Sequence, residues 1–194
     1  MREALPDEVF LDCGDDYGSL PNKVQEIVRW AYNHGYGYVL KCDDDVVLRP
    51  TAVMASGFDA HPFTGCQEPA CKPGEIQTPF GFCYWLSRSC MELILASQLP
   101  THNNDEAWVS TVLYTNNVFL HHEPRYYLHR GTRPRPTARA LRAPRRDHPP
   151  SPVPPTEAFA YCVYLNWQGF HCTPTEINLR EFQWLYDTYV KETQ

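Results

Sequence analysis

Residues 36–48 of the chain read YGYVLKCDDDVVL, and this stretch decides how the rest of the sequence is interpreted. Its first part, residues 36–41, is aromatic and aliphatic, which predicts a buried strand. Three consecutive carboxylates follow, at Asp43, Asp44 and Asp45. Adjacent carboxylates repel one another, and a hard divalent cation such as Mg²⁺ or Mn²⁺ removes that cost because it prefers oxygen ligands. A cation held in this way commonly binds a diphosphate, whereas the alternative interpretation is a solvated acidic turn.

The residues around the acidic run follow a pattern of fixed spacing. A segment of the form D-x-Y-x-N-L-x-x-K comes first, then a helix with a tryptophan, then Y-x-x-K-x-D-D-D. The positions of this chain that match it are Asp15, Asp16, Tyr17, Leu20, Lys23, Trp30, Tyr38, Lys41 and Asp43 to Asp45. This pattern resembles glycosyltransferase family 31, the group of β1,3-galactosyltransferases, N-acetylglucosaminyltransferases and Fringe proteins.

Three further segments resemble the same family in the family's order. Residues 79–88 (PFGFCYWLSR) resemble its G-G-Y-x-L-S-x-D segment, and residues 104–108 (NDEAW) resemble its E-D-V segment. Residues 169–172 (GFHC), with the helix-like segment that follows them, resemble its late V-H-S strand and closing helix. The resemblance thus touches most of residues 9–128 and again residues 159–190. It implies the GT-A fold and a metal-dependent, inverting transfer from a UDP-sugar.

The resemblance also implies roles for the acidic run and for one histidine. Asp45 and His171 would bind the metal together with Asp43, and an imidazole ligand suits Mn²⁺ better than Ca²⁺. Mg²⁺ is the other cation considered. Asp43 or Asp44 would contact the donor sugar or its ribose, with Lys41 beside them as a partner of the acidic loop. Seven other histidines compete with His171 for the metal.

An inverting transfer needs a base that removes the proton of the acceptor hydroxyl. By resemblance this base is Glu106, with Asp105 as second candidate, although the family usually carries aspartate where this chain has Glu106. Two acids in the first turn of a helix are also favoured by the helix dipole alone, and Asn103 with Glu106 fits an ordinary capping box. Tyr84 and Trp85 are candidates for a sugar-stacking floor, although core packing is the commoner use of such residues.

One departure from the family keeps a second class of function open. Family members carry a strand–helix–strand unit before the matched part, and this unit supplies much of the uridine pocket. This chain begins almost at its matched D-x-Y segment. The alternative hypothesis is therefore a catalytically inactive, truncated relative that binds glycans or a protein. A metal-dependent nuclease or phosphatase is a more distant third hypothesis.

Composition predicts one globular domain. The chain has 194 residues, of which 43% are hydrophobic and 13% aromatic, enough for a substantial core. No apolar run approaches the length of a membrane span, and the N-terminus has no apolar core of a signal peptide, so we expect a soluble, cytoplasmic protein.

The eight cysteines include no C-x-x-C pair, and we expect reduced thiols, although Cys66 and Cys71 would pair in an oxidising compartment.

A segment rich in arginine and proline interrupts the domain. Residues 125–146 contain eight arginines and no acid, and residues 134–155 contain eight prolines. Such a segment cannot form the interior of a helix or sheet, so we expect a flexible insertion at 130–157. It would separate a catalytic core at 1–129 from a strand and helix at 158–194 that complete the same domain. The insertion is either a solvated loop or a basic flap that meets an anionic partner. The acceptor expected from the resemblance is a glycan, a protein or a hydroxymethylated DNA base, and the arginine-rich segment motivates the last of these.

The hydrophobic periodicity predicts alternating strands and helices. We expect strands at 8–12, 36–41, 82–86, 118–122, 125–129 and 159–167. We expect helices at 20–34, 50–56, 89–98, 105–114 and 178–190, the third of them opened by a capping box at Ser89, and a loop over 60–79. This alternation indicates an α/β domain with a mixed sheet flanked by helices.

Overall fold

The computed structural model describes residues 5–43, 46–67, 74–130 and 160–164, and this part of the chain has an α/β fold. The chain divides into two compact units. The first unit contains the described residues up to Cys42 together with the segment Phe58–His122. The second unit contains Asp43–Gly57 and the described residues from Glu123 onward. That the whole chain forms a single domain remains a prediction.

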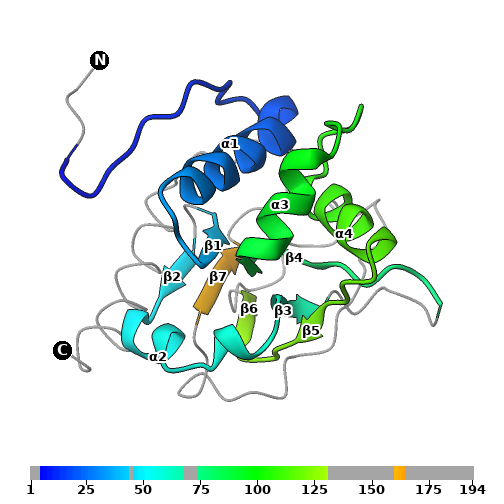
Figure 1. Ribbon diagram of the computed structural model, residues 1–194. Coiled ribbons are helices and arrows are strands. Elements are labelled where there is room, and N and C mark those ends of the chain that lie inside the picture. The colour runs from blue at the N-terminus through cyan, green and yellow to red at the C-terminus, as the bar shows by residue number, and fades with distance from the viewer. Residues whose placement is uncertain (1–4, 44–45, 68–73, 131–159, 165–194) are drawn as a thin grey trace, which may run out of the picture. The chain divides into compact units, whose positions relative to one another are not determined.

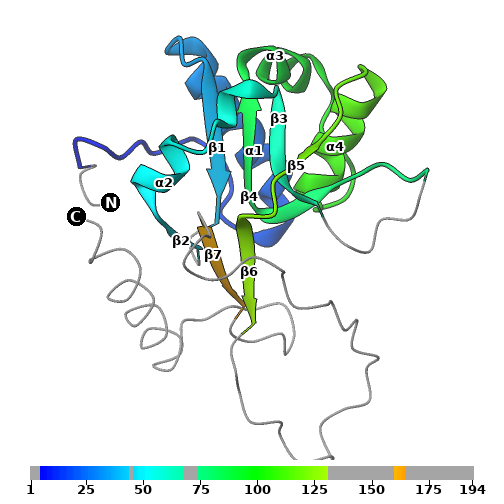
Figure 2. The same ribbon diagram turned by 90° about the horizontal axis from the view of Figure 1, so that it is seen from below.

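The first unit is built on a four-stranded mixed sheet (Figure 1). Its elements are η1 (Tyr17–Ser19), α1 (Leu20–Asn33), β1 (Tyr38–Cys42), η2 (Phe58–Ala60), β3 (Phe63–Gln67), β4 (Pro79–Ser87), α3 (Arg88–Ala96), α4 (Asp105–Thr115) and β5 (His121–His122). The strand order is β1-β4-β3-β5, in which β4 runs antiparallel to both of its neighbours and β5 runs parallel to β3. Figure 2 shows β1, β4 and β3 side by side.

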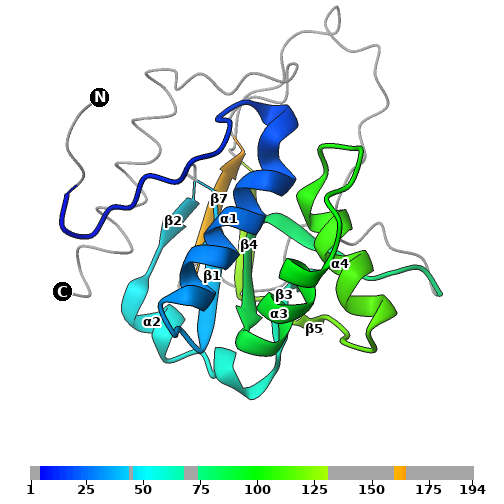
Figure 3. The ribbon, with the colours of Figure 1, turned by 45° about the horizontal axis from the view of Figure 1, so that its top comes forward.

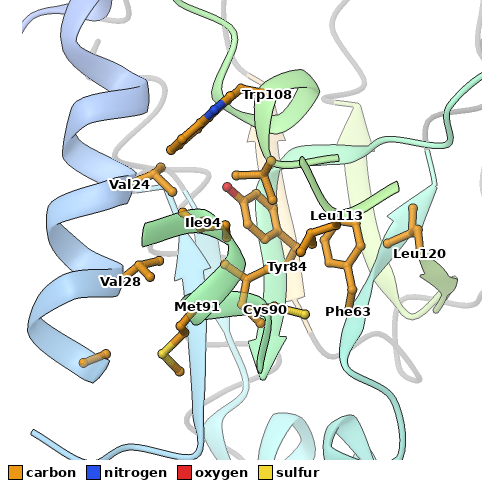
Figure 4. Close-up of a cluster of buried hydrophobic side chains, with 13 residues drawn as sticks. Val24, Val28, Phe63, Tyr84, Cys90, Met91, Ile94, Trp108, Leu113 and Leu120 are labelled. Atoms are coloured by element: carbon orange, nitrogen blue, oxygen red, sulfur yellow. The ribbon is translucent and has the colours of Figure 1, made fainter. Parts of the chain in front are cut away.

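The three α-helices of this unit, α1, α3 and α4, cover one face of its sheet (Figure 3). The core lies between them and the strands (Figure 4). Its fully buried members come from every layer: Val24 and Val28 of α1, Met91 and Ile94 of α3, Val109 and Leu113 of α4, Phe63 of β3, and Tyr84 and Leu86 of β4. Each such side chain contributes about 1.5–3 kcal/mol by leaving water, so this core fixes the sheet and helices against one another.

Helix α1 illustrates why local sequence specifies these helices. Val24, Val28 and Ala31 recur at helical spacing and are all buried. Pro21 occupies the first turn, where its missing N–H costs nothing. Gly35 ends the helix with a φ of 78°, a conformation that glycine adopts without strain. The helix expected at 20–34 is confirmed, as is the helix expected at 105–114.

Two expectations about strands are wrong. Residues 8–12 form no strand, and Val9 and Phe10 are 48% and 61% exposed, so this short apolar run does not reflect burial in a sheet. The loop expected at 60–79 contains β3, which is paired on both sides. The glycine at position 65 favoured a loop in the prediction. The structure gives another reason for it, since a Cβ at Gly65 would lie 3.1 Å from the Cβ of Tyr84 on the neighbouring strand.

Several boundaries differ from those expected. Strand β4 is longer than predicted, and β5 is reduced to two residues. The capping residue of α3 is Ser87 rather than Ser89, because the Ser87 hydroxyl accepts the N–H of Cys90. The capping residue of α4 is Asn104 rather than Asn103. Side-chain caps depend on the local course of the chain, which the sequence pattern places only to within a residue or two.

The second unit contains a three-stranded sheet of order β2-β7-β6. Its elements are β2 (Val46–Leu48), α2 (Pro50–Met54), β6 (Tyr126–Arg130) and β7 (Ala160–Tyr164). Strand β2 runs antiparallel to β7, and β6 runs parallel to it. These elements agree with the helix expected at 50–56 and the strands expected at 125–129 and 159–167, within the described residues. The Arg/Pro insertion was expected at 130–157; its first residue, Arg130, belongs to β6, and its other residues lie outside the described part of the chain, as does the closing helix expected at 178–190.

Candidate active site

A cluster of polar groups lies within the first unit, where β1, β4 and the beginning of α4 meet. We call it the Lys41–Asp105 cluster, and it consists of Lys41, Gly81, Tyr84, Asp105 and Glu106. Strand pairing places Lys41 directly opposite Tyr84. The first turn of α4 supplies the two acids. Three segments far apart in the sequence therefore build this cluster.

Asp105 is held by two buried partners. Its Oδ2 lies 3.6 Å from Nζ of Lys41, and the two side chains are 4% and 8% exposed. The hydroxyl of Tyr84 donates a hydrogen bond to the same oxygen over 3.3 Å. The Lys41 ammonium also donates to the carbonyl of Gly81. A buried polar group is costly unless it is paired and hydrogen-bonded, and these contacts provide the Asp105 carboxyl group with such partners.

Glu106 is half-buried beside this ion pair, against the backbone of Gly81. A Cβ added at Gly81 would lie 3.0 Å from Oε2 of Glu106 and 3.1 Å from its Cδ, so the missing side chain makes room for this carboxyl group. Burial, the largest cause, and the charge of Asp105 raise the pKa of Glu106 to about 7 against the opposing charge of Lys41. Glu106 therefore exchanges a proton near neutral pH.

Two hydrogen bonds fix the start of α4 and so the direction of these acids. The Asn104 side chain accepts the N–H of Ala107 over 2.7 Å. The indole of Trp108 donates to the carbonyl of Gln98 over 3.1 Å. A capped first turn places adjacent residues on different sides of the helix, so Asp105 faces the ion pair while Glu106 meets Gly81.

The acidic run begins where β1 ends. Asp43 follows Cys42 in the chain, two residues after Lys41, and its side chain is half-buried. Asp44, Asp45 and His171 lie outside the described residues, so their roles remain predictions. Carboxylates combined with an imidazole form a donor set that fits Mn²⁺. Within the described ranges, no group of three or more His, Cys, Asp and Glu residues is placed to hold a metal ion.

The proposed sugar-stacking floor at Tyr84 and Trp85 is wrong. Tyr84 is fully buried, and its hydroxyl is directed to Asp105. Trp85 is 6% exposed and stacks on Phe58 with 3.9 Å between ring centroids. Both rings are parts of the core. Sequence reasoning missed the contribution of Gly81, although a glycine within an aromatic strand signals close approach of another group.

The matched D-x-Y residues have local structural roles. Asp16 caps η1, since its carboxylate accepts both the N–H and the hydroxyl of Ser19. The hydrogen bond from Ser19 holds the pKa of Asp16 below its usual value. Lys23 forms an ion pair with Asp15 on the surface. These contacts fix the turn that leads into α1.

Comparison with known proteins adds no assignment to this geometry. No protein-family model matches the chain, and a search of curated proteins finds no match. In the part of the chain that the structure describes, no helix is both long enough and apolar enough to cross a membrane. The function is therefore argued from the residues of the site.

Proposed function

We propose that this chain is an inverting glycosyltransferase of the family 31 type, with a GT-A-like fold, that moves a sugar from a UDP-sugar to an acceptor hydroxyl. The observation that supports this most strongly is Glu106, a half-buried carboxyl group whose pKa is raised to about 7. The residue occupies the position to which the sequence resemblance assigns the catalytic base. A base is most effective when its pKa lies near the working pH.

The chemistry requires one proton transfer. The acceptor oxygen forms a bond to the anomeric carbon while the bond from that carbon to the diphosphate oxygen breaks, and UDP departs with the bonding electrons. The acceptor proton passes to the ionised carboxylate of Glu106. The charge of Asp105 makes Glu106 a stronger base, and Lys41 balances the charge of Asp105. This arrangement supports Glu106 as the base and Asp105 as the residue that tunes it.

The acidic run supports the donor-binding part of the proposed activity. Asp43, Asp45 and His171 would hold Mn²⁺ or Mg²⁺, which as a Lewis acid offsets the negative charge that develops on the departing diphosphate. Asp43 and Asp44 would also contact the donor sugar or its ribose. Lys41 has its ammonium group on Asp105 and Gly81, so its contribution to donor binding would act through the position of the residues that follow it.

The test is a thermal-shift panel of UDP-sugars with and without Mn²⁺, combined with an assay of UDP release. A ligand that binds the folded state raises the melting temperature by mass action. We expect a Mn²⁺-dependent shift for one UDP-sugar, lost in Asp45→Ala and retained in Asp7→Ala, an exposed control. Glu106→Gln should keep the shift and lose turnover.

Two outcomes would contradict the proposal. If no UDP-sugar shifts the melting temperature with Mn²⁺, the chain has no working donor site. If donor binding occurs but Glu106→Gln turns over at the wild-type rate, Glu106 is not the base. Binding of a glycan with no turnover under any condition would favour the alternative, a non-catalytic binding module.

A further inference from the structure

Two cysteines lie directly opposite each other on neighbouring strands of the first unit. Strand pairing places Cys42, the last residue of β1, opposite Cys83 of β4. Residues in direct register on antiparallel strands point to the same face of the sheet, with about 4.5–5.5 Å between their Cα atoms. A disulfide needs about 4.4–6.8 Å between Cα atoms, so this pair meets that requirement. The two cysteines are not joined by a disulfide in the structure.

The two thiols differ in their access to solvent. Cys42 is exposed, whereas Cys83 is 0% exposed. An oxidant in solution therefore reaches Cys42 first, and Cys83 is placed to react with the oxidised sulfur from the neighbouring strand. An accessible cysteine beside a second cysteine that resolves it is the arrangement of redox-sensing pairs. Disulfides of this kind are transient in a reducing compartment, which is compatible with the reduced thiols expected from the sequence.

The pair lies on the opposite face of the same two strands that carry part of the Lys41–Asp105 cluster. Cys42 follows Lys41 in β1, and Cys83 precedes Tyr84 in β4. Because side chains alternate along a strand, Lys41 and Tyr84 face one side of the sheet and the two cysteines face the other. The register that aligns the cysteines is the register that sets Lys41 opposite Tyr84. A covalent bond between the cysteines would therefore fix the strand pairing on which the cluster is built.

Strand β1 is the element that such a bond would hold most firmly. It lies at the edge of the sheet, and β4 is its one strand partner among the described residues (Figure 2). The backbone hydrogen-bonding groups of an edge strand are exposed to water, and local opening begins where such groups are exposed. Opening of β1 would carry Lys41 away from Asp105, because β1 supplies the lysine of that ion pair.

We propose that Cys42 and Cys83 form a reversible disulfide on oxidation, which fastens β1 to β4 and protects the Lys41–Asp105 cluster from opening. The oxidant is a low-molecular-weight disulfide such as oxidised glutathione. The Cys42 thiolate attacks one of its sulfurs, forms a mixed disulfide and releases one glutathione thiolate. The Cys83 thiolate then attacks the Cys42 sulfur, so that the bond from Cys42 to glutathione breaks and the second glutathione thiolate leaves. The two protons of the protein thiols end on the two glutathione molecules released.

Peptide mapping after alkylation tests the pairing. The full chain is incubated with oxidised glutathione, the remaining thiols are alkylated, and linked peptides are identified by mass spectrometry. We expect a Cys42–Cys83 disulfide that excess reduced glutathione opens again. Cys66→Ser is the matched control, because Cys66 is half-buried on β3, the other neighbour of β4, and this variant should form the same disulfide. A Cys42 that carries only glutathione, or a disulfide from Cys83 to another cysteine, would overturn the proposal.

Melting temperature and amide hydrogen exchange test the effect on β1. The disulfide restricts the unfolded chain, so oxidation should raise the melting temperature by about 5–15 °C. The amides of β1 should exchange more slowly in the oxidised protein. Both effects should be lost in Cys42→Ser, which alters an exposed side chain and leaves the core intact, and kept in Cys66→Ser. Unchanged β1 exchange and an unchanged melting temperature in the oxidised wild type would overturn the proposal.

Turnover separates this proposal from the proposed function, on which only the link to transfer rests. If UDP release persists to higher temperature in the oxidised protein, and Cys42→Ser loses this difference, both proposals are supported. If transfer occurs but is inactivated at the same temperature in both redox states, the proposed function is supported and the protection of the cluster is not. If the disulfide forms and protects β1 but neither redox state turns over any donor, the redox proposal is supported and the proposed function fails.

Discussion

Lys41 and Asp105 form a buried ion pair that joins β1 to the first turn of α4, with 3.6 Å between Nζ and Oδ2. Its single positive charge offsets one of two adjacent carboxylates, Asp105 and Glu106. The pKa of the second carboxylate, Glu106, is raised to about 7, chiefly by burial and then by the charge of Asp105. The stability of the unit and the proton affinity of its candidate base are therefore linked through one lysine.

Removing that lysine should destabilise the protein strongly. Lys41→Met leaves the buried Asp105 without its cation, and breaking a buried pair in this way costs about 3–5 kcal/mol. Lys23→Met is the matched control, because its partner Asp15 is 96% exposed and surface pairs contribute about 0–1 kcal/mol. Denaturant unfolding of both variants measures the difference. If both variants lose the same free energy of unfolding, the buried Lys41–Asp105 pair stabilises the protein no more than the surface pair does.

Catalysis should depend on the ionised form of Glu106. The rate of transfer is expected to rise with pH through about 7, because the base must lose its proton before it can accept that of the acceptor. Glu106→Gln should lower the rate by about 10²- to 10⁴-fold. Rates of UDP release across pH 5 to 9 test this. A wild-type profile that stays flat across this range would remove Glu106 from the chemistry.

The same carboxyl group should make stability depend on pH in the opposite direction from most acids. Its folded pKa of about 7 exceeds the reference value of 4.5, so the folded state binds the proton more tightly. The resulting stabilisation is complete below pH 4.5 and is lost as the pH rises through 7. We expect Glu106→Gln to remove this loss and to be about 3 kcal/mol more stable than wild type at pH 8. Denaturation at pH 5 and pH 8 measures both values, and an equal wild-type pH dependence in the variant would contradict the raised pKa.

How much of the fold the sequence predicts depends on how local each element is. Helices α1 and α4 are predicted because their apolar spacing and their end signals lie within the helix itself. Strand β3 was not predicted because it depends on pairing with β4 and β5, which the local sequence does not show. Its glycine and cysteine were instead interpreted as residues of a loop. The strand expected at 8–12 is wrong for the converse reason, since a short apolar run forms a strand only where a pairing partner exists.

In the candidate site, too, the local sequence identifies the residues, whereas their properties depend on contacts made only in the folded protein. The resemblance selected Glu106 and Asp105 as acids of interest, but it did not show how they differ. Their difference comes from Lys41 and Gly81, which reach them only because β1 and β4 pair in one particular register. Register is a property of the folded sheet, so neither the pKa of Glu106 nor the anchoring of Asp105 was visible in the sequence.

Asp105 should tune Glu106 through charge. Asp105→Asn removes the neighbouring negative charge and leaves Lys41 to attract the ionised Glu106, so the pKa of Glu106 should fall from about 7. The pH at which transfer begins should fall with it. NMR titration of the Glu106 carboxyl carbon measures the change directly, and Asp59→Asn, at an exposed position, should leave it unaltered. A pKa that rises in Asp105→Asn would show that the two carboxyl groups do not interact as described.

Gly81 should control the burial on which the pKa of Glu106 chiefly depends. In Gly81→Ala the new Cβ would lie 3.0 Å from Oε2 of Glu106, which is too close, so the flexible carboxyl group must turn toward solvent. Because burial is the largest cause of the raised pKa, the pKa of Glu106 should fall toward 4.5 and the rate profile should shift to lower pH.

Gly37→Ala is the matched control, since its Cβ would have no atom within 4 Å. The global stability of both variants should stay within about 1 kcal/mol of wild type, because alanine at a permitted backbone conformation restricts the unfolded chain and offsets a small local strain. If the profile of Gly81→Ala matches that of Gly37→Ala, the close approach of Gly81 does not set the proton affinity of Glu106.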